Sequence, residues 1–520
     1  MGTQINNSWI KCISLDLTPP SLKDNTADVD RVLKGLCKTL KTHKVTVGIP
    51  LARELPELLR EWNYSVRAVC YQWDGLWHLI RADRGGDSFP PLYCIALDLG
   101  TSTLVLRAID LMSSQVSIER SFRNPQIQIG SDILARIHYS SQDGGLQRLH
   151  EMLIHEVNHQ IQEMGRDLEV GKDSFIALAV AGNTTMTHFF LNLNPYWICR
   201  EPYIPVINVP DLFPASELAI SINPAAPVLV FPNVGSYFGG DLIAGILSSG
   251  MTKDQEISLL VDVGTNAEVV IGNSDWLMGC AGAAGPALEG GVAAMGMMAG
   301  PGAIDKIEID PKTLEIRYHT IGDKPPLGIC GSGFIDLVAQ LYLAGMIDIR
   351  GKFVPSRCGH RLIYIDEIPH LVVVDASHSG SGKPITVSQP DIDSLIRSKA
   401  AMFTILTTLT KTVGVNFEDI SRFYIAGTFG SYINPRSAII IGMLPDLPLE
   451  VYQVLGNTSL EGSTLALLSK EARDEAYEVR DKTTYLELNV NQEFMNLFSA
   501  AKFIPHTDRS LFPSVPPPAS

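Results

Sequence analysis

LYCIALDLGTSTLVLRAI, at residues 92–109, consists of two apolar runs on either side of a tight polar turn. The runs predict two β-strands joined as a hairpin. ISLLVDVGTNAEVVI, at residues 257–271, repeats the arrangement much later in the chain. Each segment places Asp-(Leu/Val)-Gly-Thr-(Ser/Asn) at the turn. A repeat over such a distance indicates a duplicated domain and not a short-period solenoid.

The residue types in these turns suit a nucleotide. Glycine lets backbone N–H groups approach phosphate oxygens without a Cβ in the way, and hydroxyl groups add donors. An aspartate on the preceding strand can hold Mg²⁺, usually through water. Two such turns are best explained by two lobes that face one nucleotide. The metal-binding and catalytic candidates are Asp98 and Asp262, and the phosphate-binding candidates are Gly100, Thr101, Ser102, Thr103, Gly264, Thr265 and Asn266.

Two further glycine-rich segments are candidates for the same site. Gly427 and Gly430 delimit a turn after the predicted buried strand 422–426, and this turn could lie against an adenosine. Residues 279–302 are rich in Gly, Ala and Met. They fit either a phosphate-facing loop or close helix packing by small residues. Glu289, the one acid in this segment, is a third catalytic candidate, because it could orient water or metal.

Composition limits the class of protein. The 520 residues are 45% hydrophobic and carry a net charge of −15, which argues against nucleic-acid binding. None of the eight cysteines belongs to a C-x-x-C pair. The sequence shows no signal peptide and no apolar run of membrane-spanning length. We therefore expect a cytoplasmic α/β protein without a membrane partner. The predicted parts are a small α/β domain (1–90), two lobes (91–255 and 256–505) and a flexible tail (506–520).

Two motif matches are better explained by ordinary surface structure. Residues 155–159, HEVNH, match the H-E-x-x-H zinc signature, but both histidines fall opposite the apolar stripe of the predicted helix 144–165. Residues 377–384, SHSGSGKP, depart from a P-loop at both ends, where Ser377 and Pro384 stand. We expect a solvated helix face and a loop, respectively.

The paired turns and the later glycine turn resemble the acetate and sugar kinase, heat-shock protein and actin superfamily. More specifically, the chain resembles the ATP-dependent reductive activators of corrinoid proteins. An ordered series of stretches over nearly the whole chain carries this resemblance: 17–24, 124–137, 181–186, 239–245, 262–266, 280–290, 328–336, 425–432 and 456–462. It implies an α/β fold in which two RNase H-like lobes flank a nucleotide cleft, preceded by a small α/β segment.

The resemblance also implies a function. Such activators use ATP to return a corrinoid protein from inactive Co(II) to Co(I). ATP and Mg²⁺ are then the expected cofactors, with phosphates at the Asp98 and Asp262 turns and adenosine between Gly427 and Gly430. The expected partners are a corrinoid protein and, as one option, a second copy of the chain.

Family members carry an iron–sulfur module with clustered cysteines, which this sequence lacks. The module is truncated, separate or lost, and we expect a separate ferredoxin-like electron donor. Two alternatives stay open: a small-molecule kinase, whose base would be Asp241 or Glu289, and a nucleotide-gated binding protein without redox activity.

Overall fold

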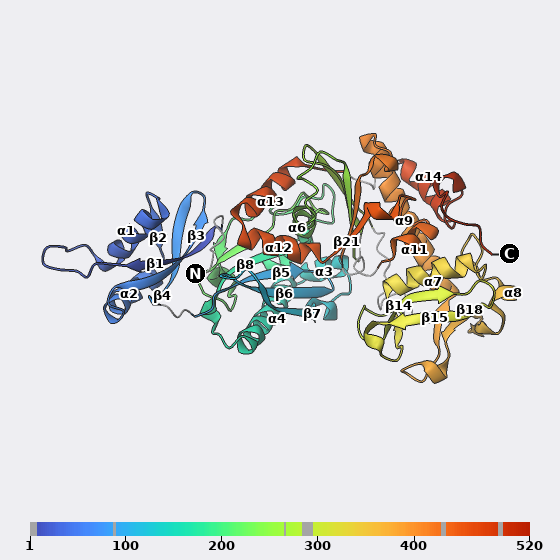
Figure 1. Cartoon of the computed structure of the whole chain (residues 1–520), viewed down its shortest axis with the longest axis horizontal. Coiled ribbons are helices and arrows are strands. Elements are labelled where there is room, and N and C mark those ends of the chain that lie inside the picture. Colours follow the sequence, from blue (N-terminus) through green and yellow to red (C-terminus); the bar gives the residue numbers. More distant parts are fainter. Residues whose placement is uncertain are drawn as a thin grey trace. The chain divides into compact units, whose positions relative to one another are not determined.

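The computed structural model describes residues 8–86, 90–264, 267–282, 295–427, 433–486 and 492–519. The chain forms two compact units: Met1–Ser248 with Ser459–Asp481, and Ser249–Thr458 with Lys482–Ser520. Residues 459–481 therefore pack with the first unit, although they lie within the predicted second lobe, 256–505. In Figure 1 these residues form the red helices α12 (Thr458–Leu468) and α13 (Lys470–Lys482).

The first unit begins with a small α/β domain. Its sheet has the order β1-β3-β4-β2, and β1 pairs antiparallel with β3. Alternate residues such as Leu15, Val66 and Ala68 pack against the buried apolar residues of the two helices, among them Leu36 and Leu55. These alternate residues make one face of the sheet apolar, and this face packs against the helices. The elements are β1 (Ile10–Asp16), α1 (Asp28–Leu40), β2 (Val45–Val47), α2 (Ile49–Glu61), β3 (Ser65–Trp73) and β4 (Leu76–Arg84).

The rest of the first unit is built on a sheet of order β7-β6-β5-β8-β10-β9. The hairpin predicted at 92–109 is confirmed as β5 and β6, and β8 runs parallel to β5. All residues of β8 are buried, as expected for a parallel strand with both faces covered. The strands are β5 (Tyr93–Leu99), β6 (Thr103–Asp110), β7 (Val116–Arg123), β8 (Phe175–Gly182), β9 (Phe213–Pro214) and β10 (Pro227–Val230); the helices are α3 (Ile133–Ser140), α4 (Gly145–Asp167), α5 (Thr184–Phe190) and α6 (Gly240–Ser249).

The second unit repeats this sheet. Its order is β21-β20-β11-β12-β13-β22, with β11–β12–β13 antiparallel and β20 and β21 parallel beside β11. Three antiparallel strands followed by two parallel strands are thus common to both sheets, so the expected pair of RNase H-like lobes is confirmed. The strands are β11 (Ser258–Val263), β12 (Ala267–Gly272), β13 (Leu277–Gly282), β20 (Arg422–Ala426), β21 (Tyr452–Gly456) and β22 (Thr483–Tyr485).

Two smaller sheets and several helices complete the second unit. Figure 1 shows α7 beside β14 and β15 in yellow. The long helix α9 begins with a capping box at Ser388 and Asp391 and ends at Gly414, whose φ is +70°. The elements are β14 (Ala303–Ile309), β15 (Ile316–Thr320), β16 (Gly328–Ile329), α7 (Gly331–Leu343), α8 (Pro355–Cys358), β17 (Leu362–Ile365), β18 (Ile368–Val374), β19 (Ile385–Ser388), α9 (Gln389–Val413), α11 (Pro435–Ile440) and α14 (Gln492–Ala501).

The C-terminal residues, for which composition predicts a flexible tail, lie against the core of the second unit. Phe512 and Val515 are buried there. The buried Lys399 of α9 donates hydrogen bonds to the carbonyl oxygens of Phe503 and Pro505. A few apolar side chains can hold such a segment against the core, even when its average composition is that of a loop.

None of the helices in the described ranges combines the length and apolar character needed to span a membrane.

Candidate nucleotide-binding edges

In the first unit, the carboxyl ends of β5 and β8 lie side by side and carry the first predicted turn. Asp98 is the next-to-last residue of β5 and pairs with Val105 on β6 and Ala181 on β8. A Cβ on Gly100 would collide with the carbonyl oxygen of Thr103, so the tightness of this turn requires glycine. The carboxyl ends of parallel strands are where ligands of open α/β sheets bind.

Two asparagines hold this turn in place. The Asn124 Nδ2 donates to the Gly100 carbonyl oxygen at 3.0 Å, and Asn124 is buried. The Asn183 Nδ2 donates to the Thr101 hydroxyl at 2.9 Å, while its Oδ1 caps α5 by accepting from the Met186 N–H. The backbone of Gly100 and the hydroxyl of Thr101 are therefore fixed before any ligand arrives, which lowers the cost of ordering them on binding.

Two residues from distant parts of the sequence interact with Asp98. The Ser459 hydroxyl on α12 donates to Asp98 Oδ1 at 2.9 Å. Burial raises the pKa of Asp241 to about 7, and the negative charge of Asp98 adds to the shift. From the sequence, Asp241 was a candidate only as the base of the kinase alternative, and Ser459 had no predicted role. Their positions beside Asp98 depend on tertiary packing, which local patterns do not reveal.

In the second unit, the carboxyl ends of β11 and β20 bring two predicted residues together. Asp262 on β11 pairs with Ala426, the last residue of β20, and Gly427 follows directly. Gly427 has a φ of +87°, and a Cβ there would lie 2.5 Å from Asp262 Oδ1. The glycine predicted to face adenosine thus adjoins the acid predicted to hold metal. Thr265, Asn266, Glu289 and Gly430 fall outside the described residues.

The carboxylates at these edges fit magnesium by their chemistry. Asp98 and Asp262 each offer hard oxygen ligands, and Mg²⁺ is usually bound through one or two carboxylates together with water and substrate phosphates. Within the described ranges, no group of three or more His, Cys, Asp or Glu side chains could enclose a metal ion. Asp98 and Asp262 thus suit Mg²⁺ that is also bound by water and by nucleotide phosphates.

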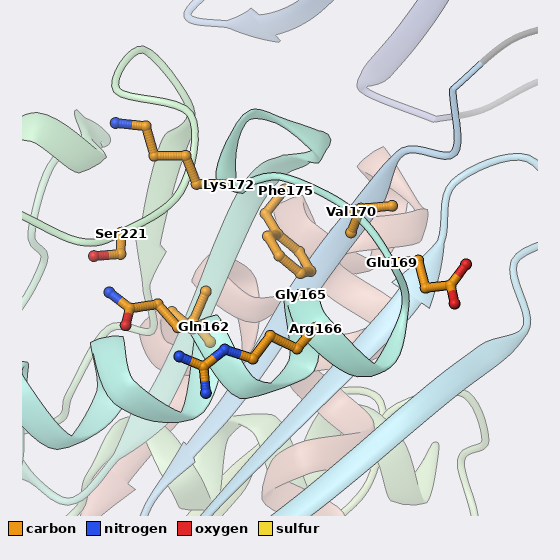
Figure 2. A pocket seen from close by; sticks show the side chains of 9 residues that line it. Gln162, Gly165, Arg166, Glu169, Val170, Lys172, Phe175 and Ser221 are labelled. Atoms are coloured by element: carbon orange, nitrogen blue, oxygen red, sulfur yellow. The ribbon is translucent and has the colours of Figure 1, made fainter.

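A hollow of about 530 Å³ lies elsewhere on the first unit (Figure 2). It lies beside the carboxyl end of α4 and the amino end of β8, the opposite end of that strand from Asn183. Its charged residues, Arg166, Glu169 and Lys172, are all exposed. Figure 2 shows the ends of Lys172 and Glu169 pointing in opposite directions, so their charges do not converge on one ligand.

The surface explanations of the two motif matches are confirmed. His155 and His159 are exposed on α4, whereas Leu149, Leu153 and Val157 of the same helix are buried. Residues 377–378 and 380–383 are exposed in the loop before β19. Neither segment adds a functional side chain to the two edges.

Comparison with protein families accounts for almost the whole chain. Residues 256–516 match the C-terminal domain of RACo, described as its ASKHA domain. Residues 93–254 match the RACo middle region, and residues 5–87 match the RACo linker region. The fold is thus that of the ASKHA class, the acetate and sugar kinase, heat-shock protein and actin superfamily. The chain belongs to the RACo family within it.

Individual relatives agree with this assignment. A solved structure titled "Reductive activator for corrinoid, iron-sulfur protein" shares 39% identity and a TM-score of 0.91, over 98% of this chain and 81% of that one. The corrinoid activation enzyme RamQ of Eubacterium limosum is 29% identical over 94% of this chain and 82% of RamQ. A reductase for the Co(II) methylated amine-specific corrinoid protein of Methanosarcina barkeri is 26% identical over 78% of this chain and 76% of the reductase.

Proposed function

We propose that this chain is an ATP-dependent reductive activator that returns a corrinoid protein from Co(II) to Co(I). The observation that carries the proposal is the agreement along the chain with a reductive activator, at 39% identity and a TM-score of 0.91. Two further relatives are named for corrinoid activation and for reduction of a Co(II) corrinoid protein. No comparable support favours the kinase or the binding protein without redox activity.

The two edges supply the nucleotide-binding residues of this proposal. The turn after Asp98, fixed by Asn124 and Asn183, would bind phosphates through its N–H and hydroxyl groups. The turn after Asp262 would do the same, and Gly427 would leave room for the nucleoside. The proposed set is that of the sequence analysis: Asp98, Gly100, Thr101, Ser102, Thr103, Asp262, Gly264, Thr265, Asn266, Glu289, Gly427 and Gly430.

Magnesium bound with the nucleotide would neutralise developing charge on the phosphates. Asp98 and Asp262 would position the metal's water ligands. Asp241, with a pKa of about 7, could accept or release a proton near Asp98 at neutral pH. Glu289 is proposed, on the sequence argument alone, as a third catalytic residue that would orient water or metal.

The redox step requires a second protein. Reduction of Co(II) to Co(I) consumes one electron, and ATP hydrolysis to ADP and phosphate supplies free energy but no electron. We propose that a separate ferredoxin-like iron–sulfur protein donates this electron. The corrinoid protein is the substrate, and its cobalt is the atom reduced.

An anaerobic absorbance assay tests this function. A corrinoid protein in the Co(II) state is mixed with the chain and reduced ferredoxin, and conversion to Co(I) is followed with Mg-ATP, with Mg-ADP or without nucleotide. We expect Co(I) only with Mg-ATP. The Asp262→Asn variant should lose this activity, whereas Asp366→Asn, the same change at an exposed hairpin turn of the second unit, should retain it. Equal Co(I) formation without ATP would contradict the proposal.

A further inference from the structure

The helix α12 brings a hydroxyl group to the first nucleotide-binding edge from the far end of the chain. Ser459 lies in its first turn, and its side chain donates to Asp98 Oδ1 at 2.9 Å although the two residues are 361 positions apart. Ser459 is only 5% exposed. A hydrogen bond from a buried donor to a carboxylate fixes the orientation of that carboxylate more firmly than a bond in water would.

Further contacts hold α12 in one register along the first unit. Arg107, on the strand that follows the Asp98 turn, contacts Glu461 Oε2 at 2.6 Å and the Thr464 hydroxyl at 3.2 Å. A Cβ on Gly462 would collide with the carbonyl oxygen of Ala244 on α6, so glycine allows the two helices to approach closely. The position of Ser459 is thus determined by several contacts on one rigid element.

We infer that Ser459 is a positioning residue for Asp98 and that it prepares this carboxylate to receive magnesium-bound nucleotide. The inference rests on the proposed function and assigns a role within it to a residue that the motif argument left unused. The hydroxyl holds Oδ1, so the carboxylate does not have to be reoriented when the metal's water ligands arrive. This lowers the cost of binding Mg-ATP and leaves binding of metal-free ATP unaffected.

Calorimetric titration of ATP, in saturating Mg²⁺ and separately in EDTA, tests this role. The readout is the dissociation constant in EDTA divided by that in Mg²⁺. This ratio reports how much magnesium tightens ATP binding. We expect Ser459→Ala to reduce this ratio about tenfold, the effect of one hydrogen bond to a charged group, with the value in EDTA unchanged. Ser459→Cys, which replaces the hydroxyl with a thiol that donates only weakly, should behave in the same way. Ser459→Thr keeps the hydroxyl and should restore the ratio.

Ser463→Ala is the matched control. Ser463 is buried one helical turn further along α12, and its hydroxyl donates to the backbone carbonyl of Ser459. This variant should keep the wild-type ratio. The inference is overturned if the folded Ser459→Ala and Ser459→Cys variants also keep it, or if they weaken binding equally in Mg²⁺ and in EDTA. A wild-type chain that binds no ATP in either condition would instead overturn the proposed function itself.

Discussion

Gly427 lies directly against the Asp262 carboxylate, so that a Cβ at position 427 would be 2.5 Å from Oδ1 and 2.6 Å from the carbonyl oxygen of Val263. Real Cβ atoms do not approach oxygen so closely. The parallel pairing of β11 and β20 causes this proximity, because it brings the ends of both strands to one edge. The position of the Asp262 carboxylate therefore depends on having glycine at position 427, which is far away in the sequence.

Gly427→Ala should weaken ATP binding. The added methyl group would displace Asp262, and we expect calorimetry to show at least ~10-fold weaker Mg-ATP binding, since about 1.4 kcal/mol corresponds to a factor of ten. Gly414→Ala is the control, because Gly414 has a similar φ of +70° but no atom within 4 Å of the added Cβ. Both variants should lose about 1–2 kcal/mol of stability from the left-handed backbone. Equal ATP affinity in the two variants would contradict the proposed site.

Asp241→Asn should stabilise the folded chain at neutral pH. Burial and the nearby Asp98 raise the pKa of Asp241 from 3.8 to about 7 in the folded state. Between these two pH values, Asp241 is ionised in the unfolded state but still protonated in the folded state. The stability of the wild type therefore falls as pH rises from about 4 to 7. The loss is on the order of 4 kcal/mol at pH 8, because each pKa unit corresponds to ~1.4 kcal/mol. Thermal unfolding should show the variant melting higher at pH 8, with little difference below pH 4.

Asp310→Asn provides a control of opposite sign. Hydrogen bonds from the Thr313 and Lys312 N–H groups lower the pKa of the Asp310 carboxyl. Its contribution to stability is therefore present above pH 3.8 and lost as pH falls through the lowered value. This variant should melt lower than the wild type at pH 8 and approach it in acid. A shift of the same sign in both variants would contradict the assignment for Asp241.

Arg473→Ala should loosen the small domain from the rest of the first unit. The Arg473 guanidinium lies 5.0 and 5.1 Å from the ring centroids of Trp9 and Trp73, and its Nη1 donates to the Gln72 carbonyl oxygen at 2.8 Å. Loss of these contacts should cost about 2–3 kcal/mol. Tryptophan fluorescence should therefore change at lower urea concentration than in the wild type. Arg480→Ala, which removes a more exposed arginine of α13 paired with Asp481, should leave the midpoint unchanged.

The sequence predicted the parts of the fold that depend on local patterns. The Asp-x-Gly-Thr turns mark both hairpins, because apolar runs of strand length flank residues that only a tight turn needs. The run before Gly427 likewise marks β20. Those strands fix where Asp98, Asp262 and Gly427 lie, so these three positions followed from sequence alone.

The remaining features depend on contacts between distant segments. Ser459 reaches Asp98 because α12 returns to the first unit, and no periodicity in residues 458–468 indicates which sheet the helix joins. The raised pKa of Asp241 depends on its burial and on the charge of Asp98, which comes from a distant part of the sequence. The packing of Phe512 and Val515 could not be predicted from composition either, because two apolar residues among prolines and serines do not form a recognisable pattern.

The central claim is that ATP hydrolysis by this chain drives one-electron reduction of a corrinoid protein. The most direct measurement follows two quantities in one anaerobic reaction: the electron paramagnetic resonance signal of Co(II), and the phosphate released. We predict that the Co(II) signal disappears only with Mg-ATP and the reduced donor together, and that phosphate release accompanies its loss. Loss of the signal without phosphate release, or phosphate release at full rate with the signal intact, would contradict the account.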